Sequence, residues 1–110
     1  MSESISFIVH LPSKLGSVDE LERRLLDVLE AMSKEPDFIN TYLSRAIDDA
    51  STLVLYETWG CSREHFFNHH LKASYRIAYE DALPALLRKE RTLEFLAPRR
   101  SYERPKVERS

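Results

Sequence analysis

The spacing of apolar side chains along the chain predicts a strand followed by a long helix. Residues 4–11 are rich in β-branched and aromatic types and alternate in part, as a strand with one buried face does. Over residues 18–34 the apolar side chains recur every three or four positions, which is the period of an amphipathic helix. Pro36 cannot continue this helix and disfavours helical geometry just before itself. Ser17 and Glu20 have the S-x-x-E spacing of a capping box, which predicts the helix start.

The middle of the chain predicts a hairpin. Residues 38–47 and 52–59 are strand-like runs on either side of a polar spacer whose residues favour turns. Gly60 ends the second run. Ser62 is then predicted to cap a short helix that reaches Leu71.

The last third predicts one more helix and one more strand. A second apolar stripe of helical period runs through residues 75–87, and Pro84 interrupts it, so we expect a kink or a new turn there. Residues 91–97 have strand character. Residues 98–110 are charged and show no apolar period, which predicts a tail that is flexible or docks on a partner subunit through Tyr102 and Val107.

The order β-α-β-β-α-β predicts an α+β, ferredoxin-like domain over residues 1–97, with a four-stranded antiparallel sheet and helices on one face. Both faces of the predicted strands carry apolar residues, although two helices can cover only one of them. An exposed apolar sheet face is unfavourable for a monomer. We therefore expect a homodimer in which two copies pack face to face.

Composition and charge narrow the class of partner. The 110 residues suit a single domain, and 16 basic against 18 acidic residues give a net charge of −2. This balance gives no electrostatic reason to expect nucleic acid or a membrane as a partner. The N-terminus lacks the features of a signal peptide, and Cys61 is the sole cysteine, so we expect a cytoplasmic protein without an internal disulfide.

Three short motifs carry a family resemblance. The runs Leu55–Trp59 (LYETW), His70–Ser74 (HLKAS) and Ala82–Pro84 (ALP) resemble the antibiotic biosynthesis monooxygenase family, which includes quinol monooxygenase-like proteins. The resemblance covers roughly residues 4–97 and implies a dimeric α+β barrel. It also implies a reaction without metal, flavin or another cofactor, in which an electron-rich phenol or quinol loses a proton and its anion reduces dioxygen. The implied partners are a small aromatic substrate and dioxygen.

His70 is the implied catalytic base. It aligns with the histidine of the family pattern, and an imidazole titrates near neutral pH. The competing interpretation is a helix histidine bonded to a backbone carbonyl or to solvent. Tyr75 replaces the second histidine of many relatives. Haem-degrading relatives use an asparagine on the first strand and a histidine on the last helix. Neither residue is present here, so we do not expect haem degradation.

Aromatic residues on the predicted helices and hairpin offer a pocket for a flat ligand. The candidates for substrate binding are Trp59, Phe66, Phe67, Tyr75 and Tyr79. Aromatic residues at helical spacing are also typical of an ordinary core, so both interpretations stay open. His10 points either into the same cavity or at the dimer interface.

Two further groups of residues are of types that take part in ion pairing or metal binding. Glu57 lies in a predicted strand, where it would pair with Arg45 across the hairpin or hold a catalytic histidine in one tautomer. Cys61, His65 and His69 are spaced by four and are ligand types that zinc accepts. Because Cys61 precedes the helix and no further ligand is evident, we predict no metal site.

The function favoured by the sequence is thus a cofactor-independent monooxygenase acting on a quinol-like or polyketide-like aromatic. Two alternatives remain. One is a non-oxidative isomerase or cyclase on the same barrel. The other is a non-catalytic ligand-binding or assembly module, in which the aromatic side chains fill the cavity themselves.

Overall fold

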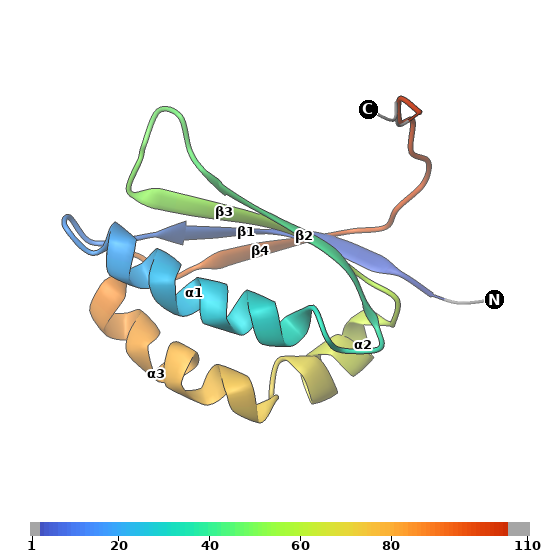
Figure 1. The fold of residues 1–110 in the computed structure, drawn as a ribbon, viewed down its shortest axis with the longest axis horizontal. Helices are drawn as coiled ribbons and strands as arrows, with labels where there is room; N and C mark the ends of the chain where they lie inside the picture. Colours follow the sequence, from blue (N-terminus) through green and yellow to red (C-terminus); the bar gives the residue numbers. More distant parts are fainter. Residues whose placement is uncertain (1–2, 106–110) are drawn as a thin grey trace, which may run out of the picture.

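A computed structural model describes residues 3–105 and shows one antiparallel sheet with all its helices on one face (Figure 1). The strands are β1 (Ile5–Pro12), β2 (Phe38–Arg45), β3 (Thr52–Trp59) and β4 (Thr92–Leu96), in the order β2-β3-β1-β4. The helices are α1 (Val18–Met32), α2 (Arg63–His65), the π-helical η1 (Phe66–His70), the 3₁₀-helical η2 (Ser74–Arg76) and α3 (Ile77–Leu86). The predicted α+β, ferredoxin-like fold is confirmed.

The register of the two central strands decides which side chains reach the core. Val9 pairs with Leu55 and Leu11 with Leu53, and all four are buried beneath the helices. Because strand side chains alternate, the residues between them point to the opposite face of the sheet. There His10 is exposed.

The first helix follows its predicted stripe but begins differently. Its buried residues are Leu21, Leu25, Val28, Leu29 and Met32. Ser17 has a near-helical backbone (φ −105°, ψ −2°) and makes no side-chain cap bond, whereas a capping serine usually has extended geometry. Glu20 instead accepts hydrogen bonds from Arg23 (2.7 Å) and Arg24 (2.6 Å), so the predicted capping box is wrong. The helix also ends at Met32, two residues before the predicted end.

The second helical region is divided into short pieces. Ser62 has extended geometry, and its Oγ accepts a hydrogen bond from the His65 N–H at 3.0 Å, which confirms this cap. The turn from Phe66 to His70 is π-helical, and α3 begins only at Ile77. No new turn begins at Pro84, because α3 runs through it to Leu86.

The sheet face opposite the helices is uncovered in a single chain (Figure 1). On this face Tyr42 is 62% exposed and Tyr56 is 38% exposed, with ring centroids 6.2 Å apart. The chain after β4 runs on this side of the sheet (Figure 1) without regular secondary structure as far as residue 105. Val107, one of the two predicted docking residues, lies outside the described residues. No helix among residues 3–105 is long and apolar enough to cross a bilayer.

Candidate functional site

His70 is held inside the protein at the end of the π-helical turn. Its side chain is 2% exposed, and its ring packs against Trp59 at a tilt of 34°, with ring centroids 4.4 Å apart. Nε2 lies 2.8 Å from Oδ2 of Asp37. Nδ1 has no hydrogen-bond partner and lies 3.5 Å from Oε2 of Glu35. The partner of His70 is therefore a carboxylate and not the backbone carbonyl or solvent of the competing interpretation.

Sequence reasoning missed Asp37 as a partner of His70. It lies between α1 and β2, 33 residues before His70, where no periodic pattern connects the two residues. The hydrogen bond with His70 lowers the pKa of Asp37, so its carboxylate stays charged at neutral pH. The one local signal is its place directly after Pro36, where the chain turns toward the sheet.

A second group of polar residues surrounds a cavity between the sheet and the helices. The cavity measures about 20 Å³, which is room for about one water molecule. Its polar lining residues are Glu57, Arg76, Tyr79 and Arg91, and its walls are otherwise apolar. Phe66 also lines it, whereas His70 does not.

Burial makes both acidic groups of this cavity hard to ionise. Glu57 is 4% exposed, and desolvation raises its pKa although Trp59 Nε1 donates a hydrogen bond to it at 3.0 Å and Arg76 and Arg91 attract its charge. Desolvation likewise raises the pKa of Tyr79 to about 12, so its hydroxyl is a neutral donor at physiological pH. A buried carboxyl with a raised pKa that faces cations is typical of a catalytic site.

The predicted partners of Glu57 are not the observed ones. The hairpin register places Arg45 opposite Leu53 and Glu57 opposite Thr41, so the two side chains are not neighbours across the strands. Arg45 instead binds Asp19 and Glu22 of α1 at 2.9 and 3.0 Å. The carboxylate that holds a histidine is Asp37.

Arg91 connects the cavity with a groove on the surface. Its guanidinium makes two hydrogen bonds to Glu80, at 2.7 and 2.8 Å, and Arg76 adds a third at 3.1 Å. The groove is lined by the second half of α3 and by residues 87–91, which lead to β4, and has a volume of about 520 Å³. Leu83, Pro84 and Leu87 supply its apolar wall. Arg91 thus lines both spaces.

The structure distributes the predicted substrate-binding residues over several environments. Trp59 and Phe66 are fully buried and pack on each other, with ring centroids 5.5 Å apart. Phe67 is 38% exposed and packs on Phe95. Tyr75 is half-buried, with a hydroxyl that lacks a hydrogen-bond partner. His10 lies on the uncovered sheet face, away from the cavity, in agreement with the interface alternative.

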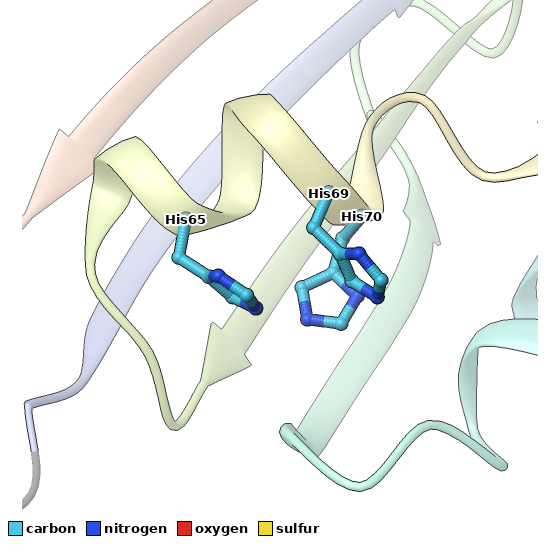
Figure 2. A group of neighbouring side chains, drawn as sticks. All are labelled: His65, His69 and His70. Carbon is cyan, nitrogen blue, oxygen red and sulfur yellow. The ribbon is translucent and has the colours of Figure 1, made fainter.

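A cluster of histidines lies beside the Asp37–His70 pair (Figure 2). Side-chain nitrogens of His65, His69 and His70 all lie within 4.8 Å of one another, and the rings of His65 and His69 stack. Asp37, Cys61 and His70 form an overlapping group by the same distance. These two groups hold the residue types that bind transition metals.

The four-stranded sheet and the single helical layer define a small α+β domain of ferredoxin-like topology, with a cavity between sheet and helices that four polar residues and otherwise apolar ones line. The family model for antibiotic biosynthesis monooxygenase matches residues 5–82, and the chain belongs to this family. A comparison with curated protein sequences finds no match.

Solved structures share the fold at low sequence identity. Rv0793 of Mycobacterium tuberculosis is 17% identical, with a TM-score of 0.79, over 91% of this chain and 99% of that one. PA3566 of Pseudomonas aeruginosa is 18% identical, with a TM-score of 0.79, over 91% and 98%. SnoaB of Streptomyces nogalater, described as a cofactor-independent oxygenase, is 18% identical, with a TM-score of 0.75, over 90% and 96%.

Proposed function

We propose that the chain is a cofactor-independent monooxygenase that oxidises a quinol-like or polyketide-like aromatic with dioxygen. The reaction site is the cavity between the sheet and the helices, and Glu57 is its base. The observation that carries the proposal is this buried carboxyl, whose pKa is raised by burial and which faces Arg76 and Arg91. Family membership and the likeness to SnoaB support the reaction class.

The cavity residues have the properties that such a reaction requires. Glu57 accepts the proton of a substrate hydroxyl, because a raised pKa makes a carboxylate a better base near neutral pH. Arg76 and Arg91 stabilise the resulting anion, and the neutral Tyr79 hydroxyl donates a hydrogen bond to it. The anion then reduces dioxygen. A ring C–H or CH₂ becomes a carbonyl, one oxygen atom enters the product, the other leaves as water, and the substrate supplies all the electrons.

Substrate access requires the cavity to open. An aromatic ligand needs roughly 300 Å³ or more, far beyond the closed volume. The surface groove of about 520 Å³ is large enough, and Arg91 lines both the groove and the cavity. In this proposal the substrate enters from the groove and displaces Arg91 from Glu80.

His70 remains the other candidate for the base. Its support is the family position and the Asp37 carboxylate on Nε2, which would fix the tautomer and leave Nδ1 free to take a proton. Against it, neither the cavity nor the groove is lined by His70. We therefore assign the base to Glu57 and test both residues together.

The test measures oxygen uptake with a panel of quinols and anthrone-like phenols, above the rate of autoxidation without protein. The variants are Glu57→Gln, His70→Asn and, as a matched control, Glu30→Gln on the exposed side of α1. We expect Glu57→Gln to lower kcat at least a hundredfold, the usual scale for a lost general base. Glu30→Gln should retain the wild-type rate. With ¹⁸O₂, one labelled atom should appear in the product.

Each result separates the alternatives. Loss of uptake in a folded His70→Asn variant, with normal uptake in Glu57→Gln, would move the base to His70. Turnover of a panel compound without oxygen uptake would favour the isomerase or cyclase. Neither turnover nor uptake across the panel would favour the ligand-binding or assembly module, which the small closed volume of the cavity also favours.

We further propose that two copies form a homodimer through the uncovered sheet face. Tyr42 and Tyr56 leave an aromatic patch exposed on β2 and β3, and the helices occupy the other face. A second copy offers the same face, so a two-fold axis pairs patch with patch.

A further inference from the structure

We propose that the chain binds one Zn²⁺, or a similar divalent transition-metal ion, through His65, His69, His70 and Asp37. The site lies at the end of the π-helical turn, beyond Trp59 as seen from the cavity, and is separate from the proposed reaction site. Three imidazoles and one carboxylate form a donor set that zinc accepts in four-coordinate sites. Because protein side chains supply all four ligands, no coordination position is left for a substrate, and the ion has a structural role.

The donor atoms already lie close to a coordinating arrangement. Oδ2 of Asp37 lies 3.3 Å from Nε2 of His65 and 2.8 Å from Nε2 of His70. With metal–ligand bonds of about 2.0–2.1 Å, ligand atoms of a tetrahedral site are about 3.3 Å apart. One nitrogen from each of the three histidines lies within 4.8 Å of the others, so the side chains must rotate to bring all four donors onto one ion.

The local helix geometry explains why three histidines converge. In an α-helix, His69 would lie above His65 while His70 would point well to one side. The π-helical turn of η1 bonds residues five apart, as the Leu71 N–H does to the Phe66 carbonyl at 2.9 Å. The wider turn lets both His69 and His70 contact His65, with ring centroids 5.1 and 5.3 Å from its ring (Figure 2).

The second ring nitrogen of His70 is a separate observation in favour of a metal. Its Nδ1 is buried without a hydrogen-bond partner, at 3.5 Å from Oε2 of Glu35, in a side chain that is 2% exposed. An unpaired buried polar atom is costly and rare. Metal-bound histidines commonly present the other ring N–H to a carboxylate. A metal on Nε2 would place a proton on Nδ1 and direct it toward Glu35.

The site is reachable from solvent on one side and fixed on the other. The side chains of His65 and Asp37 are 49% and 34% exposed, so an ion can enter without opening the core. His70 is immobilised against Trp59. The sequence argued against a metal because no ligand beyond Cys61, His65 and His69 was evident. The fold supplies Asp37 and His70 from places that the helical spacing does not connect.

The test is a Zn²⁺ titration of the metal-free full chain in competition with a chromophoric chelator. We expect one ion per chain and a raised melting temperature with zinc, because ligand binding stabilises the folded state. His65→Asn and His69→Asn alter exposed side chains and should each weaken zinc binding at least tenfold. His10→Asn removes a histidine from the opposite sheet face and should leave the affinity within about twofold. Cys61→Ser should behave like His10→Asn.

Several results would overturn the proposal. They are equal affinity in the His65, His69 and His10 variants, a tenfold loss in Cys61→Ser, and a stoichiometry of one ion per two chains. Far-UV circular dichroism of each metal-free variant shows whether it is folded. None of these readouts uses oxygen consumption, so failure of the zinc site and failure of the monooxygenase proposal are distinguishable.

Discussion

Burial and nearby charges have opposite effects on the pKa of Glu57. Desolvation raises its pKa, while the Trp59 hydrogen bond and the charges of Arg76 and Arg91 lower it, and desolvation is the larger effect. The folded protein therefore binds this proton more tightly than the unfolded chain, whose carboxyl has the ordinary pKa of 4.5. As the pH rises through 4.5 toward the folded-state pKa, the unfolded chain loses the proton first, and the free energy of unfolding falls.

Glu57→Gln should remove this loss of stability. The amide keeps an acceptor for Trp59 but carries no charge at any pH, so the variant should gain stability relative to wild type as the pH rises above about 4.5. Urea unfolding at a series of pH values measures the difference. Glu30→Gln, at an exposed position of α1, is the control and should follow the wild-type curve. Parallel curves for wild type and Glu57→Gln would show that burial does not shift this carboxyl.

The sequence identified several single residues of the site but few of their partners. The family position and the helical pattern singled out His70, Trp59 and Phe66, which do lie together in the structure. The patterns report which face of an element a residue occupies, and they carry no information about a loop residue 33 positions away. Asp37 was missed for this reason. The pairing of Glu57 with Arg45 failed because it depends on hairpin register.

The sequence predicted which helices and strands are present better than it predicted the residues at which they begin and end. The helix over α1, the hairpin of β2 and β3, and the last strand all appear within two residues of their predicted bounds. Apolar periodicity extends over a whole element and survives local exceptions, whereas an end depends on a few hydrogen bonds. The π-helical turn has no apolar period of its own, so the sequence predicted one short helix there.

The two serines that precede α1 and α2 allow the contribution of a cap hydrogen bond to stability to be measured. Ser62 Oγ accepts a hydrogen bond from the His65 N–H, whereas Ser17 makes no side-chain cap bond. Ser62→Ala should therefore lower the free energy of unfolding by about 1 kcal/mol, and Ser17→Ala by less than about 0.5 kcal/mol. Chemical denaturation of both variants under one condition measures the two values. An equal loss at both positions would mean that Ser17 caps α1 in solution after all.

At the scale of the whole molecule, the sequence predicted the topology because each local pattern agreed with it. The β-α-β-β-α-β order leaves few antiparallel arrangements, and the observed order β2-β3-β1-β4 is the ferredoxin-like one. The same reasoning predicted that a single chain leaves one apolar face of its sheet uncovered. One sheet face is covered by helices, and the other retains exposed tyrosines.

Tyr42→Glu should disrupt the proposed dimer without unfolding the chain. The side chain is 62% exposed in one copy, so the substitution costs the monomer little, but in the dimer it would bury a carboxylate against Tyr56 and its symmetry mates. Because burying an unpaired charge costs several kcal/mol, the dimer dissociation constant should rise at least about tenfold. Sedimentation equilibrium over a concentration series measures it. Leu26→Glu, at a half-exposed position on α1, is the matched control and should leave the constant unchanged. A Tyr42→Glu protein that still dimerises as wild type would place the interface elsewhere, and the uncovered face would then need another partner.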